Sequence, residues 1–78
     1  MAVTVGDIKA IIDEAGVLAD LDDIQAGLPL RQQNIDSLDM ANILLLIEEK
    51  YELDVPDKDL DRLQSIDGII KYLDEMIG

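Results

Sequence analysis

Apolar residues recur at helical spacing in three separate segments of this chain, and no segment has the alternating pattern of a half-buried strand. The spacing predicts helices over residues 4–15, 37–51 and 66–77. Pro56 predicts a further short helix over residues 57–63, because proline is favoured in a first helical turn. We therefore predict an all-α fold: a small four-helix bundle with three longer helices and one short third helix.

The predicted helices carry start and stop signals at their ends. Thr4 and Asp7 have the spacing of a capping box, and Gly16 is a natural stop for the first helix. Ser65 is placed to cap the last helix, which Gly68 should weaken slightly. The predicted core positions are Val5, Ile8, Ile11, Ile12 and Ala15, then Met40, Ile43, Leu44, Ile47 and Tyr51, then Ile66, Ile69, Ile70, Leu73, Met76 and Ile77.

A long connection over residues 17–36 separates the first two helices. It is rich in aspartate and also holds Gly27 and Pro29, which are loop residues. We expect a short helical turn within residues 18–25, and we expect the apolar residues of the connection to pin it to the bundle. Those residues are Val17, Leu18, Leu21, Ile24, Leu28 and Leu30. A loop of this length in a compact domain is often functional.

Composition and charge limit the class of protein. The 78 residues predict a single small domain over 1–78, and tyrosines at 51 and 72 are its only aromatic residues, so we expect an aliphatic core. Eighteen acidic residues against six basic ones give a net charge of −12. This charge argues against binding to nucleic acid or to an anionic membrane surface, and it favours soluble partners with basic patches.

The chain contains no cysteine and no histidine. It therefore lacks thiol nucleophiles, imidazole bases and the commonest zinc ligands. The acidic run from Asp57 does not fit a calcium-binding loop, because Arg62 and Gly68 stand where glycine and glutamate are needed. We expect no metal site and no enzyme activity. With no signal peptide and no apolar run of membrane-spanning length, we expect a cytoplasmic monomer.

The second predicted helix begins at Asp36-Ser37-Leu38-Asp39. Aspartate and serine are good N-cap residues, because their short side chains accept hydrogen bonds from the free N–H groups of a first turn. The aspartates also complement the positive end of the helix. Ser37 should therefore be exposed, at or just inside the helix start. These residues alone are also consistent with a capped helix that has no further role.

A longer ordered run resembles the acyl carrier proteins. Residues 29–38, Pro-Leu-Arg-Gln-Gln-Asn-Ile-Asp-Ser-Leu, match the family's Pro-Leu-x-x-x-Gly-Ile-Asp-Ser-Leu run, with Asn34 where glycine is usual. Asparagine also tolerates a left-handed backbone, so this turn should survive the change. The match continues through residues 47–51 and 55–57 and covers nearly the whole chain.

The resemblance implies that Ser37, flanked by Asp36 and Leu38, carries 4′-phosphopantetheine, whose thiol holds acyl groups as thioesters. It implies a phosphopantetheinyl transferase as one partner, and acyl-loading, elongating and releasing enzymes as others. It also implies that these enzymes dock on the second helix. The predicted docking residues are Leu38, Asp39, Asn42, Leu45, Leu46, Glu49 and Val55.

Three positions depart from the fatty-acid-synthesis members of the family. Asn42 stands where those carriers usually have glutamate, and Lys50 stands where they tend to have a third acidic residue. Leu46 stands where a small residue is more frequent. We therefore expect the partners to belong to a specialised pathway rather than to general fatty-acid elongation. The alternatives are an aminoacyl or peptidyl carrier of a nonribosomal pathway, and an acidic helical adaptor regulated by phosphorylation of Ser37.

Overall fold

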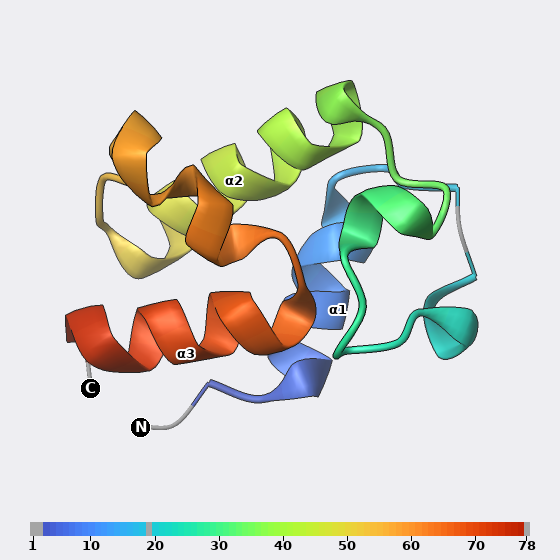
Figure 1. Cartoon of the computed structure of the whole chain (residues 1–78), viewed down its shortest axis with the longest axis horizontal. Helices are drawn as coiled ribbons and strands as arrows, with labels where there is room; N and C mark the ends of the chain where they lie inside the picture. The colour runs from blue at the N-terminus through green and yellow to red at the C-terminus, as the bar shows by residue number, and fades with distance from the viewer. Residues whose placement is uncertain (1–2, 19, 78) are drawn as a thin grey trace.

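The computed structural model describes residues 3–18 and 20–77, and all regular structure within these ranges is helical. Three α-helices, α1 (Val5–Glu14), α2 (Ser37–Tyr51) and α3 (Ile66–Ile77), surround a common core (Figure 1). The short third helix is the 3-10 helix η3 (Asp57–Leu63). Two single 3-10 turns, η1 (Leu21–Asp23) and η2 (Leu30–Gln32), lie in the long connection. The predicted bundle of three longer helices and one short helix is confirmed.

The predicted helix ends are also confirmed. The Thr4 Oγ1 accepts a hydrogen bond from the Asp7 N–H at 3.1 Å, and Asp7 Oδ2 accepts one from the Thr4 N–H at 3.0 Å, so the capping box is complete. Gly16 has a left-handed φ of 81° just after α1. The Ser65 Oγ accepts from the Gly68 N–H at 3.0 Å and caps α3.

The core consists of apolar residues from every α-helix, and within the described residues no polar or charged residue is buried. Three predicted core residues are instead exposed: Val5 in the first turn of α1, and Met76 and Ile77 in the last turn of α3. All three lie in a terminal turn, where fewer neighbours cover a helix than in its middle. The expected aliphatic core is confirmed with one exception, the Tyr72 ring, which is fully buried as well.

Tyr72 also joins η3 to α3. Its hydroxyl donates a hydrogen bond of 2.7 Å to Asp59 Oδ2, and the Arg62 guanidinium lies 4.9 Å from the centre of its ring. The hydrogen bond to Asp59, and then burial, raise the pKa of Tyr72. Arg62 also pairs with Glu75 of α3. Together these contacts fix the short helix against the last one.

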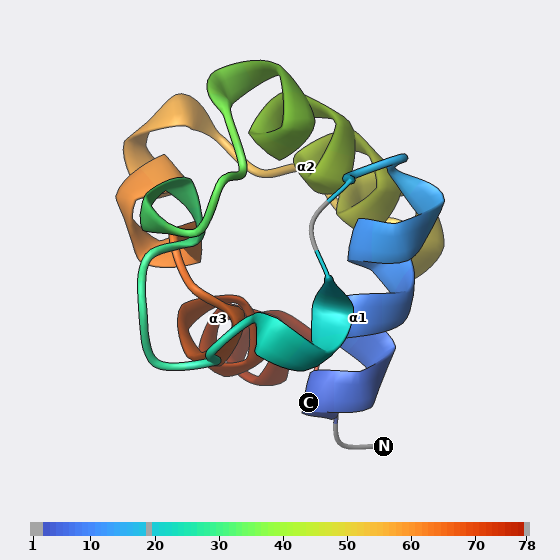
Figure 2. The ribbon, with the colours of Figure 1, turned by 90° about the vertical axis from the view of Figure 1, so that its right-hand side faces the viewer.

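The long connection runs round one end of the bundle and passes α3 before it reaches the start of α2 (Figure 2). Val17, Ile24 and Leu30 pin it to the core as predicted. Leu18 and Leu28 do not, because their side chains point into solvent. Backbone hydrogen bonds supply the remaining anchors: Asp67 N–H to Ala26 O at 3.0 Å, and Leu30 N–H to Gln64 O at 2.7 Å.

Gln33 ties the connection together internally. Its Oε1 accepts from the Gln25 N–H at 2.7 Å, and its Nε2 donates to Gln25 O at 3.0 Å and to Leu28 O at 3.1 Å. One side chain therefore supplies hydrogen-bond partners for three backbone groups of this loop, which lack the regular backbone hydrogen bonds of an α-helix. These bonds hold the connection in one conformation just before α2 begins.

Candidate functional site

Ser37 is the first residue of α2, as predicted, and its side chain is exposed. Asp36 is the N-cap: its Oδ1 accepts from the Asp39 N–H at 2.8 Å, and its carbonyl accepts from the Met40 N–H at 2.9 Å. The cap is thus made by Asp36. Within the described part of the chain, the Ser37 hydroxyl has no hydrogen-bond partner and is free for chemistry.

Asn34 sets the approach of the chain to this serine. It has a φ of 65°, in the left-handed region that glycine adopts most easily. Ile35 follows and is almost fully buried, which anchors the loop one residue before the Asp36 cap. The turn that was predicted to tolerate asparagine is present.

The helix start favours an anionic group on Ser37. The N–H groups of Ser37 and Leu38 have no acceptor within the helix, because the first helical hydrogen bonds begin later in the turn. The dipole of a 15-residue helix adds partial positive charge at the same end. A phosphate ester on the Ser37 hydroxyl would lie there, so the residues present fit a phosphate-linked group.

Most of the predicted docking residues share one exposed face of α2. Leu38 is 71% exposed and Leu45 is 54% exposed, and the side chains of Asn42 and Glu49 are exposed as well. Large apolar side chains in solvent on a small acidic protein indicate a contact surface. Asp39 is half-buried in the first turn.

Two predicted docking residues are placed differently. Leu46 was expected on the solvent side, but it is half-buried and packs against the core. It lines a small hollow between α1 and α2, whose residues are Glu14, Ala15, Asn42, Leu45 and Leu46. Val55 lies beyond the C-terminal end of α2, at the far end of that helix from Ser37, and its N–H donates to Glu48 Oε2 at 2.9 Å.

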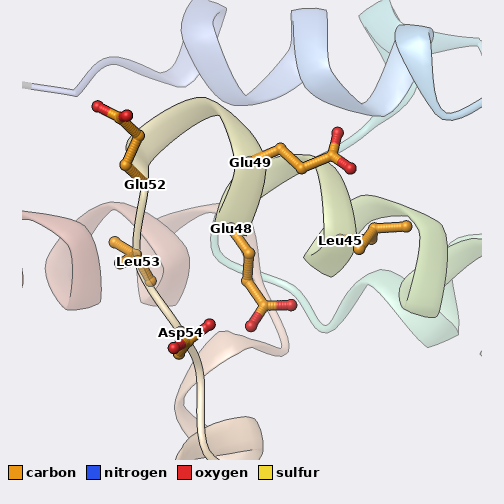
Figure 3. Close-up of a pocket in the computed structure, with 6 residues that line it drawn as sticks. All are labelled: Leu45, Glu48, Glu49, Glu52, Leu53 and Asp54. Carbon is orange, nitrogen blue, oxygen red and sulfur yellow. The ribbon is translucent and has the colours of Figure 1, made fainter.

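A second hollow follows the C-terminal end of α2 (Figure 3). Its lining residues are Leu45, Glu48, Glu49, Glu52, Leu53 and Asp54. Four carboxylates and two leucines line it, so it is acidic. The sequence analysis did not predict this hollow: Glu48 and Glu49 were interpreted only as part of the family match.

Lys50 does not lie among these carboxylates. Its Nζ forms an ion pair with Glu14 Oε1 of α1 at 3.5 Å. In residues 3–18 and 20–77, no group of three or more acidic side chains is arranged to hold a metal ion. Over the same residues, no helix has both the length and the apolar character needed to cross a bilayer.

Comparison with known proteins gives the class of this chain. Residues 8–73 match a family described as a phosphopantetheine attachment site. An acyl carrier protein of Campylobacter jejuni (strain RM1221) is 28% identical over 74 residues, which are 94% of this chain and 95% of that protein. An acyl carrier protein of Chlamydia muridarum is 33% identical over 70 residues, which are 88% and 90% of the two chains.

The chain therefore belongs to the phosphopantetheine-attachment family, the carrier proteins. The group that this family attaches is 4′-phosphopantetheine, so the predicted family and cofactor are both confirmed. The match includes the whole of α2 with Ser37 at its start, and the acidic hollow that follows it.

Proposed function

We propose that this protein is an acyl carrier whose attachment residue is Ser37. The observation that supports it best is the exposed Ser37 hydroxyl, left free by the Asp36 cap at the N-terminus of a 15-residue helix. A phosphopantetheinyl transferase would transfer the arm from coenzyme A to this hydroxyl, using its own magnesium. The Ser37 oxygen forms the new bond to phosphorus, and 3′,5′-ADP leaves.

The protein's own contribution is presentation rather than catalysis. Ser37 has no histidine near it because the chain has none, so no residue can act as the usual base for a serine nucleophile. The arm supplies a thiol that forms thioesters with acyl groups. Tethering keeps this thiol at a high effective concentration near each docked enzyme, and the exposed face of α2 receives those enzymes.

Intact mass spectrometry tests the attachment site. Apo protein incubated with coenzyme A, magnesium and a broad-specificity transferase should gain the mass of one phosphopantetheinyl group. Ser37→Ala should gain nothing, while Ser65→Ala, which removes the chain's other serine, the one that caps α3, should still be modified. Modification of the Ser37→Ala protein would overturn the assignment.

The docking face favours a specialised pathway, such as polyketide or related lipid biosynthesis. Asn42 removes a carboxylate from the centre of this face, and the exposed Leu38 and Leu45 give it apolar area. A charge at the rim of an interface acts mainly on association rate and on discrimination between partners. The proposed partners therefore present a surface that is more apolar and less basic than that of fatty-acid elongation enzymes.

Two substitutions test this choice of partners. Asn42→Glu should raise the rate at which general fatty-acid elongation enzymes use the loaded protein. Leu45→Glu should weaken docking with the protein's own partners, whereas Met76→Glu should not, although the two side chains are similarly exposed at 54% and 53%. If the unaltered protein already supports general elongation as well as a fatty-acid carrier does, the specialised pathway is wrong.

The mass of the protein isolated from its source distinguishes two alternative functions, because each attaches a different group. An aminoacyl or peptidyl carrier would hold an amino acid on the phosphopantetheine thiol. A phosphorylated adaptor would show phosphate on Ser37 and no phosphopantetheine. The family match argues against the adaptor, because phosphorylation does not account for it.

A further inference from the structure

A hollow of about 380 Å³ opens beside the start of α2 and has no part in the docking face. Its lining residues are Pro29, Arg31, Gln32, Met40 and Gln64. Met40 is three residues after Ser37, so the two lie next to each other on the helix surface. The hydrogen bond of 2.7 Å from the Leu30 N–H to Gln64 O holds the two walls together.

Arg31 gives this hollow an unusual charge for so acidic a protein. It is exposed in η2, and within the described residues it forms no ion pair, whereas Lys50 and Arg62 are both paired with glutamates. Two carboxamides, on Gln32 and Gln64, also line it. The Gln64 Nε2 donates to Asp61 Oδ1 at 3.5 Å, which leaves the second N–H of this amide for a ligand. The hollow therefore offers hydrogen-bond donors and a positive charge next to the attachment residue, and no carboxylate lines it.

We propose that this hollow binds an oxyanion carried on the Ser37 arm, with Arg31 as its counter-ion and Gln32 and Gln64 as hydrogen-bond donors. The proposal rests on attachment at Ser37. Guanidinium groups bind phosphate and carboxylate oxygens in pairs, and carboxamides can bind the amide groups of a pantetheine chain. Pro29 and Met40 provide apolar contact for its methyl groups.

Tethering raises the occupancy of a weak site. An exposed ion pair contributes too little on its own to bind a free ligand, so the hydrogen bonds of the two carboxamides must contribute as well. A group on a short covalent arm, however, is present at an effective concentration on the order of millimolar. The docked and free arms should therefore exchange rapidly, and salt should shift the balance toward the free arm.

The oxyanion has two possible sources, the phosphodiester of the arm or a carboxylate on its acyl cargo. NMR spectra of isotopically labelled protein distinguish these two sources. Four forms of the protein are compared: apo, phosphopantetheinyl, hexanoyl and adipoyl. The hexanoyl and adipoyl chains have the same length, and only the adipoyl chain ends in a carboxylate. Intact mass first establishes that each of the three modified forms carries one group, and that Ser37→Ala carries none. A failure of loading would contradict the proposed function and not this site.

The expected result is a change in the Arg31 side-chain resonances and in the Gln32 and Gln64 carboxamide resonances, which falls as salt is raised. If it appears on conversion from apo to phosphopantetheinyl protein, the phosphodiester is the ligand. If it appears only with adipoyl, the ligand is the cargo carboxylate. Arg31→Gln should abolish most of the change at Gln64, whereas Lys71→Gln, an exposed base on α3, should leave it intact.

Two outcomes would overturn the proposal. One is a correctly loaded protein in which the resonances of the hollow match those of the apo form. The other is a change at Gln32 and Gln64 that is as large in Arg31→Gln as in the unaltered protein.

Discussion

The left-handed backbone at Asn34 is the single-residue feature that brings the chain to Ser37. Asn34→Ala should lower the free energy of unfolding by about 1 kcal/mol. A residue with a Cβ atom is unfavourable in the left-handed backbone region, and alanine lacks the local side-chain hydrogen bonding that lets asparagine adopt it. Asn34→Gly should retain or raise stability. Urea denaturation measures both, with Gln32→Ala as the control at a nearby exposed position. Equal stability of the alanine and glycine variants would contradict this role for Asn34.

Tyr72 is the one aromatic residue of the buried core, and its hydroxyl has a hydrogen-bond partner. Tyr72→Phe should cost about 1–3 kcal/mol at neutral pH, because the half-buried Asp59 carboxylate loses its donor. Tyr51→Phe is the matched control, and it should cost little because no hydrogen bond of the Tyr51 hydroxyl is present within the described residues. Thermal or urea unfolding distinguishes the two variants.

The raised pKa of Tyr72 adds a pH dependence of definite sign. The folded protein holds the phenolic proton more tightly than the unfolded chain, whose tyrosine has the ordinary pKa of 10.0. This contribution to stability is complete below that value and is lost as pH rises through the raised pKa of the folded state. Tyr72→Phe should therefore lose less stability than the unaltered protein above pH 10.0. Urea denaturation on both sides of this pH measures the loss, and an equal loss of stability in both proteins would contradict this role of the Tyr72 proton.

Ser37 and Asn34 could be placed from the sequence, whereas the contacts of Tyr72 could not. The roles of Ser37 and Asn34 depend on neighbours within a few residues, so cap chemistry and turn preference were enough to place them. Tyr72 depends on Asp59 and Arg62 of another helix. Helical spacing put Met76 and Ile77 on the core face because it cannot show where the covering elements end.

Among the elements, the long connection depends most on one side chain. Gln33→Ala should lower the free energy of unfolding by about 1–2 kcal/mol, since its amide satisfies backbone groups at Gln25 and Leu28. Hydrogen exchange gives a local readout, because the Gln25 N–H loses its acceptor and should exchange faster. Gln32→Ala, one residue earlier, should leave that amide protected. Unchanged exchange at Gln25 in Gln33→Ala would mean that the loop is held by its other anchors alone.

The helices and the connection were not equally predictable. The bounds of α2 and α3 follow from periodic apolar residues and from caps, and the structure has them where the sequence placed them. The path of the connection follows from backbone bonds to α3 and from Gln33, which no local pattern encodes. For the same reason, the sequence did not indicate the Arg31 hollow, whose walls come from three elements.

At the scale of the whole molecule, charge sets a limit on stability. A net charge of −12 on 78 residues repels itself, and the described residues contain two ion pairs, Lys50 with Glu14 and Arg62 with Glu75. The hollow after α2 is one place where such repulsion acts, because Glu48, Glu49, Glu52 and Asp54 all line it, although their carboxylates point in different directions (Figure 3). Added salt, or millimolar magnesium, should therefore raise the melting temperature.

Two substitutions at Glu52 distinguish the cost of charge repulsion from the cost of backbone strain. It lies in the acidic hollow and ends α2 with a left-handed φ of 53°, beside the negative end of the helix dipole. Glu52→Gln removes only the charge, so it should raise the melting temperature at low salt and lose most of that gain at high salt. Glu52→Gly also removes the backbone cost, and it should keep about 1 kcal/mol of extra stability at high salt. Asp13→Asn, an exposed acid on α1 outside the hollow, should give a smaller gain at low salt, and an equal gain would mean that the repulsion is spread evenly over the surface.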